Sequence, residues 1–477
     1  MDEEFLAFAT IEELAALLAK RKVSSVELTG IFLRRIERLN SSLNAFLTVT
    51  VEHAMAAARR AETELAGIHR SGNTNRPLLG IPIALKDNLW TRGIRTTAGS
   101  KILRDFVPAT DATATRKMAR AGAILLGKTN MHEFAYGITN QNSHYGPAHN
   151  PWALGRISGG SSGGSAVAIA AGLCVASVGT DTGGSIRIPS AMCGIVGLKP
   201  TFGRVSVFGT VPLSPSFDHI GPLARSVPDA ALLLGLLAGR DRLDPTSSAH
   251  RVEDFRAALR KPLGKFRLGR PREHYWERLD GEVRRAVESA LREMEKYGAL
   301  VQEVSLPHLA ESNEAATNMS LAESRHFHEQ EGYFPAHAAE YGEDVRQRLE
   351  AGAHVPAVKY LEGLDMAKRM RAEFETAFQD VDAIVAPTVP VPAPPIGAEY
   401  VRIEGEQIGV RPALVGMNRP ANFTGLPAIS VPCGFTRGGL PIGLQLIGRA
   451  FDESTLLRIA HAYERSHDWG ARHPRLL

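Results

Sequence analysis

The sequence predicts an α/β fold, with a single large domain in which helices cover both faces of a central β-sheet. Between residues 79 and 225, apolar runs of strand length alternate with helical segments, as in proteins that pack helices on both faces of a sheet. Two further runs of strand length, at 428–432 and 441–447, follow a long helical stretch. Their return indicates one continuous unit over residues 1–477 that contains an insert.

The first segment, 1–70, is predicted to be helical from Thr10 onward. Thr10 with Glu13, and Ser24 with Glu27, each have the spacing of a capping box, in which a hydroxyl and a carboxylate satisfy free N–H groups at a helix start. An apolar stripe at helical spacing then predicts one buried face: Leu28, Phe32, Ile36 and Leu39. We expect these helices to dock on the sheet and to carry no chemistry.

The second segment, 79–225, is the expected catalytic core. Its strand-length runs are 81–85, 123–126, 175–179 and 195–198, and its clearest helices are 111–121 and 163–171. Ligands usually bind where the strands of such a sheet end in glycine-rich turns. We therefore expect the site at the glycine-rich turns of this segment.

The third segment, 240–415, is charged and rich in predicted helix, and we expect it to form a variable region on the substrate side. Long helices are predicted at 342–379, and a strand follows at 381–385. The fourth segment, 419–468, returns to the core with the two late strands and a last helix at 453–467.

Composition excludes several classes of protein. The formal net charge is only +4, which favours a mildly basic surface over a nucleic-acid footprint. The three cysteines, Cys174, Cys193 and Cys433, include no Cys-x-x-Cys pair, so neither a zinc ribbon nor a dithiol redox site is expected. We expect no direct binding of nucleic acid.

The first residues of the sequence and its apolar stretches favour a cytoplasmic location. The sequence begins Met1-Asp2-Glu3-Glu4, which is acidic where a secretory signal is basic. The longest apolar stretches, 166–176 and 230–239, are too short to span a bilayer. We therefore expect no association with a membrane.

A first glycine-serine cluster covers residues 159–165 and holds four glycines and three serines. It leads directly into the apolar run 166–171, which predicts a loop at a helix N-terminus that binds an anion or positions a hydroxyl. The alternative is a flexible linker, which the structured sequence directly after the cluster disfavours.

A second cluster, Gly183-Gly184-Ser185, follows the predicted strand at 175–179. Glycines allow backbone N–H groups to turn inward, so donors from residues 182–185 can stabilise an oxyanion beside the serine hydroxyl. The alternative is a simple tight turn, which is the more frequent meaning of such a motif when it stands alone.

Lys86 closes the strand at 81–85, on the side opposite to Ile83 and Leu85. Burial in apolar surroundings would lower the pKa of its amine and make the neutral base accessible. A surface lysine is the alternative. Together with the two serine clusters, however, Lys86 completes the parts for serine-based acyl transfer without histidine.

Three other patterns are rejected. Residues 122–129 match the P-loop expression, but their middle, Ala-Ile-Leu-Leu, predicts a buried strand and not a phosphate-binding loop. Gly159–Gly163 matches Gly-x-Ser-x-Gly, but the preceding residues predict a loop and not the strand of a nucleophile elbow. His326 and His328 are alternate residues and do not share a helical face, so no metal site that combines them with His337 is expected.

The motifs of this chain resemble those of the amidase signature family. The resemblance is strong at 80–225 and 419–468 and weak at 240–415. The matching strings are Lys86–Asn88, Gly159–Ser165, Gly179–Pro189, Gly197–Thr201, Asp218–Pro222, Thr424–Pro432 and Gly443–Gly448. The resemblance implies an α/β fold on a central mixed sheet and an enzyme that hydrolyses amides, with no metal or organic cofactor.

The family's Ser–cis-Ser–Lys triad is carried over by position. Ser185 resembles the nucleophile, Ser161 the bridging serine with a cis peptide bond, and Lys86 the base. The resemblance further implies an oxyanion hole from the backbone N–H groups of residues 182–185, namely Thr182, Gly183, Gly184 and Ser185. We expect Asp181 and Arg187 to pair and to brace this turn.

Two enzymes remain open within this resemblance, and a catalytically silent binding protein is a remote alternative. One is a stand-alone amidase that acts on a small amide or carbamate, and the other is the glutaminase-type A subunit of the tRNA-dependent amidotransferase. The strings at 345–352 and 418–424 favour the stand-alone enzyme. A homodimer is the default expectation, although no residue pattern indicates it.

The substrate pocket is the least readable part of the sequence. Trp90, Tyr136 and Phe217 are candidates for an apolar pocket, and Asn142 lies in the same candidate stretch as Tyr136. Ordinary packing in the core or in a loop is the alternative for each of them.

Overall fold

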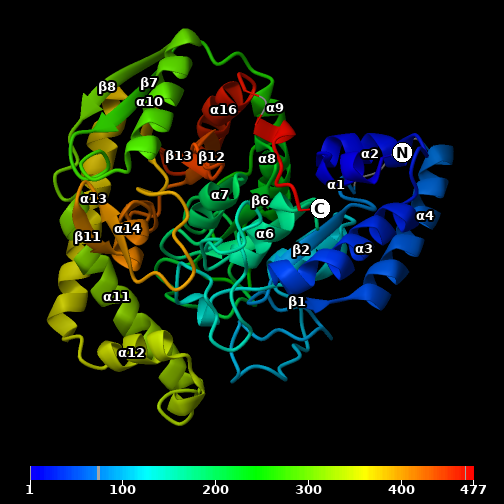
Figure 1. Ribbon diagram of the computed structural model, residues 1–477, viewed down its shortest axis with the longest axis horizontal. Coiled ribbons are helices and arrows are strands. Elements are labelled where there is room, and N and C mark those ends of the chain that lie inside the picture. The colour runs from blue at the N-terminus through cyan, green and yellow to red at the C-terminus, as the bar shows by residue number, and fades with distance from the viewer. Residues whose placement is uncertain (1, 72–75, 468, 477) are drawn as a thin grey trace.

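The computed structural model describes residues 2–71, 76–467 and 469–476 and confirms the predicted α/β fold (Figure 1). Its centre is an 11-stranded sheet with the strand order β1-β3-β2-β4-β6-β5-β12-β13-β9-β7-β8, and a separate hairpin joins β10 to β11. Strands of the core segment and of the C-terminal segment belong to the same sheet, as the prediction of one continuous unit requires.

The strands are β1 Phe46–Val49, β2 Pro82–Lys86, β3 Ile124–Thr129, β4 Ala176–Asp181, β5 Val196–Lys199, β6 His219–Ala224, β7 Phe266–Pro271, β8 Ala299–Val304, β9 Ala383–Pro387, β10 Tyr400–Ile403, β11 Glu406–Gly409, β12 Ala428–Phe435 and β13 Pro441–Gly448. The sheet is mixed, because β2 runs parallel to β3 and β4, whereas β6 and the β12–β13 pair are antiparallel to their neighbours. Every residue of β2, β3 and β4 is buried. This burial explains the apolar residues at the start of these strands, while the polar residues at their ends are buried and hydrogen-bonded.

Three strands lie where the sequence predicts helix, and this part of the prediction is wrong. β1 interrupts the N-terminal helices, and β7 and β8 lie within the charged third segment. All three are at or near an edge of the sheet. β7 and β8 carry charged residues at exposed or partly exposed positions, as edge strands tolerate, and β1 is only four residues long. These features explain why no strand is predicted there.

The helices are α1 Glu3–Phe8, α2 Ile11–Ala19, α3 Ser25–Leu43, α4 Val51–Ser71, α5 Thr113–Arg120, α6 Gly163–Ala170, α7 Arg187–Cys193, α8 Val227–Leu237, α9 Phe255–Leu259, α10 Gly281–Lys296, α11 Leu309–Gln330, α12 Glu343–Gly352, α13 Ala357–Asp380, α14 Val410–Gly416, α15 Arg419–Phe423 and α16 Glu453–Glu464. Short 3₁₀ turns lie at Glu133–Ala135, Ala338–Glu340 and Trp469–Ala471. Both predicted capping boxes are present, at the starts of α2 and α3.

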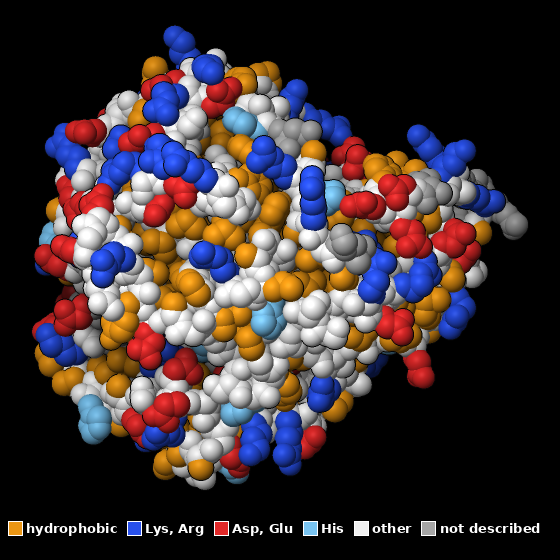
Figure 2. Space-filling model, viewed as in Figure 1, with side chains coloured by type: hydrophobic (Ala, Val, Ile, Leu, Met, Phe, Trp, Pro, Cys, Tyr) orange, Lys and Arg blue, Asp and Glu red, His pale blue; other side chains and the backbone are white. Residues whose placement is uncertain are grey.

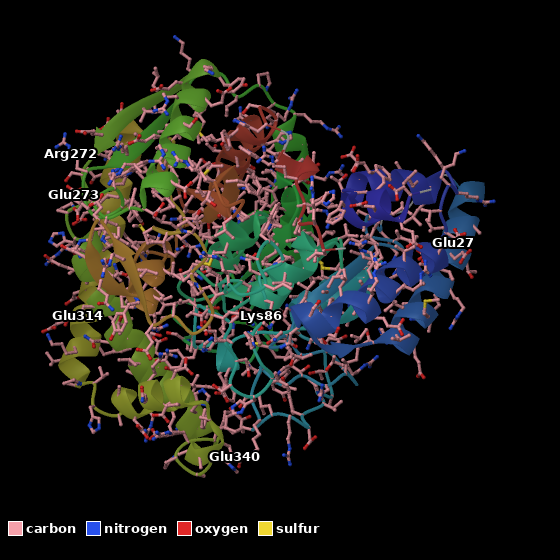
Figure 3. The ribbon with its side chains drawn as sticks, in the orientation of Figure 1. Glu27, Lys86, Arg272, Glu273, Glu314 and Glu340 are labelled. Carbon is pink, nitrogen blue, oxygen red and sulfur yellow. The ribbon has the colours of Figure 1, made fainter. Side chains whose placement is uncertain are left out.

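Two layers of helices cover the sheet. Helices α6 and α7 contact each other; α6 packs on β4, and α7 packs on β5, β12 and β13. Helix α16 contacts both α8 and α10. Helix α8 packs on β5 and β6, and α10 and α16 both pack on β12 and β13. Helices α11 and α12 lie at the lower left of Figure 1, and α13 leads from there back to the sheet, where it contacts β7. Lys86 lies near the middle of the molecule, whereas Glu314 and Glu340 lie at its periphery (Figure 3).

The structure also shows the local backbone at two of the rejected motifs, the P-loop expression and Gly-x-Ser-x-Gly. Residues 124–129 form the buried strand β3, as the rejection of a P-loop requires, and residues 150–158 form no regular strand before the glycine-serine loop. In the described ranges, no group of His, Cys, Asp and Glu is arranged to hold a metal ion. His328 is buried instead, and its Nδ1 lies 2.8 Å from the hydroxyl of Tyr341.

The surface carries both signs of charge. On the face seen in Figure 2, Lys and Arg side chains lie among Asp and Glu around the margins, and the centre of the face is mostly hydrophobic or uncharged. Within the described ranges, no helix combines the length and the hydropathy that a membrane crossing needs.

Candidate active site

Lys86 is the last residue of β2 and is completely buried. Its Nζ lies 2.7 Å from Ser161 Oγ and 2.7 Å from Thr180 Oγ1. Burial lowers the pKa of the amine to about 7, although the negative charges of Asp181 and Asp218 oppose this shift. A large fraction of Lys86 is therefore neutral near neutral pH, and a neutral amine can accept a proton.

Ser161 lies in the loop that enters α6, and the peptide bond between Gly160 and Ser161 is cis. This loop is tightly packed, because a Cβ at Gly160 would lie 2.8 Å from Asn140 N and a Cβ at Gly164 would lie 2.5 Å from the backbone of Asn130. The glycines of this cluster are thus required by close approach of other backbone segments. A flexible linker is excluded for this loop.

Ser185 lies in the turn between β4 and α7 and is 4% exposed. Its carbonyl oxygen accepts a hydrogen bond from Ser162 N at 3.2 Å, so the turn is joined to the loop that carries Ser161. Among the described residues, no hydrogen bond engages Ser185 Oγ. The residue lines a narrow cavity of about 20 Å³.

The preceding turn presents some, but not all, of the predicted oxyanion donors. Gly184 has φ of 118°, which favours glycine, and its N–H donates to Asp181 Oδ1 at 2.7 Å. The Asp181 carboxylate already accepts the Gly184 N–H, so among the predicted oxyanion donors this group is engaged within the protein. In the described part of the chain, the N–H groups of Thr182, Gly183 and Ser185 have no hydrogen-bond partner.

Asp181 and Arg187 form a buried ion pair, with Arg187 Nη2 3.0 Å from Asp181 Oδ1. Burial alone would raise the pKa of Asp181, but the Arg187 charge and its hydrogen bonds hold that pKa below its usual range. The Asn422 amide donates to Asp181 Oδ1 at 2.9 Å and accepts from Arg187 Nη2 at 2.6 Å. Gln445 Oε1 accepts from Arg187 Nη1 at 2.5 Å. This network joins the turn to α15 and β13.

We expect Asn422→Leu to lower the free energy of unfolding by about 2–3 kcal/mol, because it leaves buried charged groups with one partner fewer. Urea unfolding followed by tryptophan fluorescence measures the change. An unchanged midpoint would show that Asp181 and Arg187 do not depend on Asn422.

Thr180, Asp218 and Asn422 were missed as site residues from the sequence. Thr180 Oγ1 accepts from Lys86 and, at 3.2 Å, from Asn88 Nδ2. Asp218 accepts from Thr182 Oγ1 at 2.5 Å, and burial raises the pKa of Asp218 to about 6. Thr180 and Asp218 lie within the matching strings Gly179–Pro189 and Asp218–Pro222, and this position could have identified them as site residues.

Only one of the four pocket candidates lines the space beside Ser185. Tyr136 lines the narrow cavity that Ser185 shares. Trp90 packs against Phe106 and Phe208. The Asn142 amide donates to Gly99 O at 2.7 Å and to Met131 O at 2.9 Å, and Phe217 packs on Phe423 in the core. For these three candidates, the structure supports ordinary packing, since none of them lines this cavity or the wider space beside it.

The narrow cavity opens toward a wider space of about 320 Å³, since both are lined by Tyr136, Ser320, Arg411 and Arg419. The sequence patterns indicated neither arginine as a pocket residue. Burial lowers the pKa of Arg411 to about 9 and the pKa of Arg419 to about 10. Both side chains therefore remain cationic at neutral pH.

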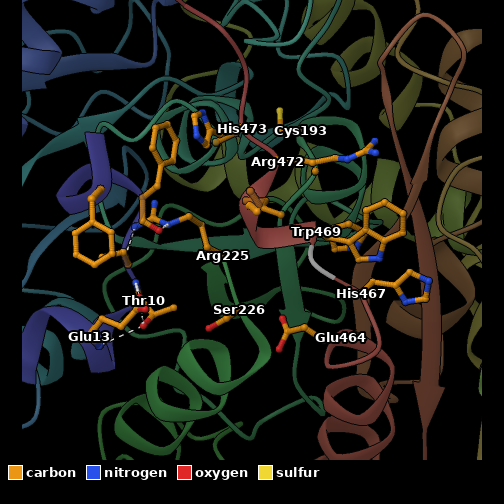
Figure 4. Close-up of a pocket in the computed structure, with 18 of the residues that line it drawn as sticks. Thr10, Glu13, Cys193, Arg225, Ser226, Glu464, His467, Trp469, Arg472 and His473 are labelled. Carbon is orange, nitrogen blue, oxygen red and sulfur yellow. Dashed lines mark hydrogen bonds between the residues drawn. The ribbon is translucent and has the colours of Figure 1, made fainter. Parts of the chain in front are cut away.

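A larger cavity, of about 690 Å³, lies between α1 and the C-terminal residues (Figure 4). Its lining includes Arg225, Glu464, Arg472 and His473. None of the three residues Lys86, Ser161 and Ser185 lines it.

Comparisons with known proteins match nearly the whole chain. A family model described as Amidase matches residues 27–457. The chain is 42% identical to the A subunit of glutamyl-tRNA(Gln) amidotransferase from Roseiflexus sp. (strain RS-1), over 98% of each chain, and 43% identical to its namesake from Dechloromonas aromatica, over 98% of this chain and 99% of that one.

Solved structures show the same fold. One, described as an inhibitor-bound vestigial protein complex that reveals the evolutionary origins of an s-triazine catabolic enzyme, has a TM-score of 0.90 at 35% identity. The match covers 96% of this chain and 98% of the other. The native peptide amidase from Stenotrophomonas maltophilia has a TM-score of 0.84 at 32% identity, with 98% of each chain covered.

Proposed function

Because this chain belongs to the amidase family and is an enzyme that acts on carbon–nitrogen bonds, we propose that it is a stand-alone serine amidohydrolase. Ser185 is the nucleophile, Ser161 the bridging residue and Lys86 the base. The observation that supports this assignment most strongly is the contact of the buried Lys86 Nζ with Ser161 Oγ at 2.7 Å.

In the first half-reaction, neutral Lys86 accepts a proton from Ser161 while Ser161 accepts the proton of Ser185. Ser185 Oγ then bonds to the carbonyl carbon of the amide. The free N–H groups of Thr182, Gly183 and Ser185 lie on the turn next to the nucleophile, and we assign them to the oxyanion that forms.

The tetrahedral intermediate then breaks its carbon–nitrogen bond. The proton held by Lys86 returns through Ser161 to the departing nitrogen, which leaves as ammonia or an amine. A water molecule attacks the remaining acyl-Ser185 and gives one proton to the same relay. The ester bond breaks, the carboxylic acid leaves, and Ser185 regains its proton. This chain's own residues thus supply the base, the bridge, the nucleophile and the oxyanion donors.

A serine-directed fluorophosphonate tests the nucleophile directly. We expect stoichiometric loss of activity with one adduct, on the peptide that contains Ser185, because the probe reacts only with an activated serine hydroxyl. Mass spectrometry locates the adduct. Absence of labelling would contradict the assignment and favour a silent binding protein, whereas an adduct on another serine would assign the nucleophile to that residue.

The pH profile tests Lys86 as the base. Its pKa is lowered to about 7 by burial, and only the neutral amine accepts a proton. We therefore expect kcat/KM to fall about tenfold per pH unit below pH 7 and to reach a plateau above it. Hydrolysis rates between pH 5 and 9 give the profile. A fall in kcat/KM that begins near the ordinary lysine pKa of 10.5, or a kcat/KM that does not change with pH, would contradict this role.

A second candidate is the A subunit of a tRNA-dependent amidotransferase, which the names of the curated relatives favour. That protein would use glutamine as its ammonia source and would depend on partner chains. Ammonia release by the purified chain from a panel of glutamine, aliphatic amides, aryl amides and carbamates separates the two candidates. Turnover of a simple amide without partners favours the stand-alone enzyme, and silence across the panel favours the amidotransferase.

A further inference from the structure

The space beside Ser185 carries an excess of positive charge. The charged residues that line the narrow and the wide cavity are Arg348, Arg411, Arg419 and Asp344. Asp344 is the one carboxylate in this lining, and it already accepts from Arg348 Nη1 at 2.9 Å and lies 2.9 Å from His132 Nε2. The two other arginines thus have no carboxylate of their own in the lining.

Arg419 begins α15 and lies beside the turn before the nucleophile. A Cβ placed on Gly183 would lie 3.5 Å from Arg419 Nε, so the guanidinium is close to the predicted oxyanion donors. Its hydrogen-bond partners within the described ranges are the neutral oxygens of Thr317 and Asn313. The positive charge of Arg419 is therefore not neutralised by the protein there.

Arg411, in α14, is half-buried and faces the same space. Its guanidinium carbon lies 5.9 Å from the centre of the Tyr136 ring, and no hydrogen bond or ion pair engages it within the part of the chain that the structure describes. The hydroxyl of Tyr136, which is 1% exposed, also has no hydrogen-bond partner there. Three polar groups around one space thus have unused hydrogen-bonding capacity.

A cation that is partly removed from water without a counter-charge is costly to the folded protein. An anion that enters the space removes this cost, and a planar guanidinium recognises a carboxylate with two parallel hydrogen bonds. The arginines lie next to the turn that holds Ser185, so an anion there would belong to the molecule being hydrolysed.

We propose that the substrate is an amide that carries a carboxylate or a similar anionic group, and that Arg411 and Arg419 bind this group. The inference rests on the proposed function and specifies its substrate class. It also predicts that glutamine binds less tightly than an amide that carries a carboxylate and no ammonium group. The only carboxylate in the lining, Asp344, is already engaged by Arg348 and His132 and is not free to bind an ammonium group.

Binding to the Ser185→Ala variant tests this inference without turnover. The probes are oxamate, malonamate, succinamate, glutaramate and adipamate, each paired with the neutral primary amide of equal chain length, and glutamine is the comparison for glutaramate. Isothermal titration calorimetry measures each affinity. We expect at least one of these amic acids to bind about 10-fold or more tightly than its neutral partner, and glutaramate to bind more tightly than glutamine.

The same titration is repeated in Arg411→Met and Arg419→Met backgrounds, with Arg402→Met as the control. Arg402 is exposed in the neighbouring strand β10, so its substitution removes the same charge away from the cavity. We expect each cavity variant to reduce the preference for the anionic probe about 10-fold, and the control to leave it unchanged.

Equal binding of charged and neutral probes, no binding by any amic acid, or an undiminished preference in both cavity variants would overturn the inference. The proposed function is judged separately by labelling of Ser185. If Ser185 is labelled but charged and neutral probes bind equally, only the proposed substrate class is contradicted. If the anionic probes bind preferentially but Ser185 is not labelled, the anion site stands and the serine mechanism is contradicted.

Discussion

Ser185→Ala is expected to reduce kcat by about 10,000-fold or more, to the level left by binding and by the oxyanion donors alone. The alanine lacks the oxygen that forms the acyl intermediate, and the other hydroxyl of the turn, on Thr182, is engaged by Asp218. The fold should persist, because Ser185 joins the neighbouring loop through its carbonyl oxygen, which alanine retains. Product release on the best amide of the panel gives kcat, and circular dichroism gives the fold.

Ser41→Ala is the matched control. Ser41 lies exposed in α3, far from β2 and α6 in the chain, and its substitution should leave kcat unchanged. Retention of more than about a tenth of wild-type activity by Ser185→Ala would exclude Ser185 as the nucleophile. In that case, Ser161 would be the next serine to test.

Lys86→Met is expected to reduce kcat by about 1,000-fold or more, because it removes the base that starts the proton relay. Methionine retains an unbranched apolar stem of similar length, so the buried volume is largely conserved. The rate that remains should no longer rise with pH near 7, since the titrating amine is absent. Steady-state rates at about pH 6, 7 and 8 measure both effects.

Lys101→Met is the control for the loss of a lysine, because Lys101 is exposed and lies outside the cavity lining. If the rate of the Lys86→Met enzyme still rises with pH near 7, the titration near pH 7 belongs to another group. Asp218 would be the first to examine, because burial raises its pKa to about 6 and it bonds Thr182.

The central strands and most helices were predictable because their residues are buried on both faces or on one regular stripe. The mostly apolar runs at 123–126 and 175–179 indicate β3 and β4, and the capping boxes of α2 and α3 mark helix starts by side-chain chemistry alone. β7 and β8 were not predictable in this way. They pair with each other in parallel near the sheet edge, so their strand character depends on a partner about 30 residues away and not on a local pattern.

The same distinction holds for the site. Lys86, Ser161 and Ser185 lie within one core segment, and their motifs indicated the chemistry before any coordinates. The state of Gly184 was not predictable, because only the fold shows that Asp181 accepts its N–H. The pocket was also not predictable, since Arg411 and Arg419 lie more than 200 residues after the nucleophile, and the string 418–424 indicated the type of enzyme but not a charge beside Ser185.

The sequence by itself determined the fold class, the family resemblance and the residue types of the expected reaction, because these depend on local patterns of burial, glycine and hydroxyl groups. Only the tertiary structure decided which N–H groups are free, how far the pKa of Lys86 falls, and which charges surround Ser185. These properties depend on desolvation and on contacts between distant segments. Burial and electrostatic fields arise only once the chain has brought α14, α15 and the core strands together.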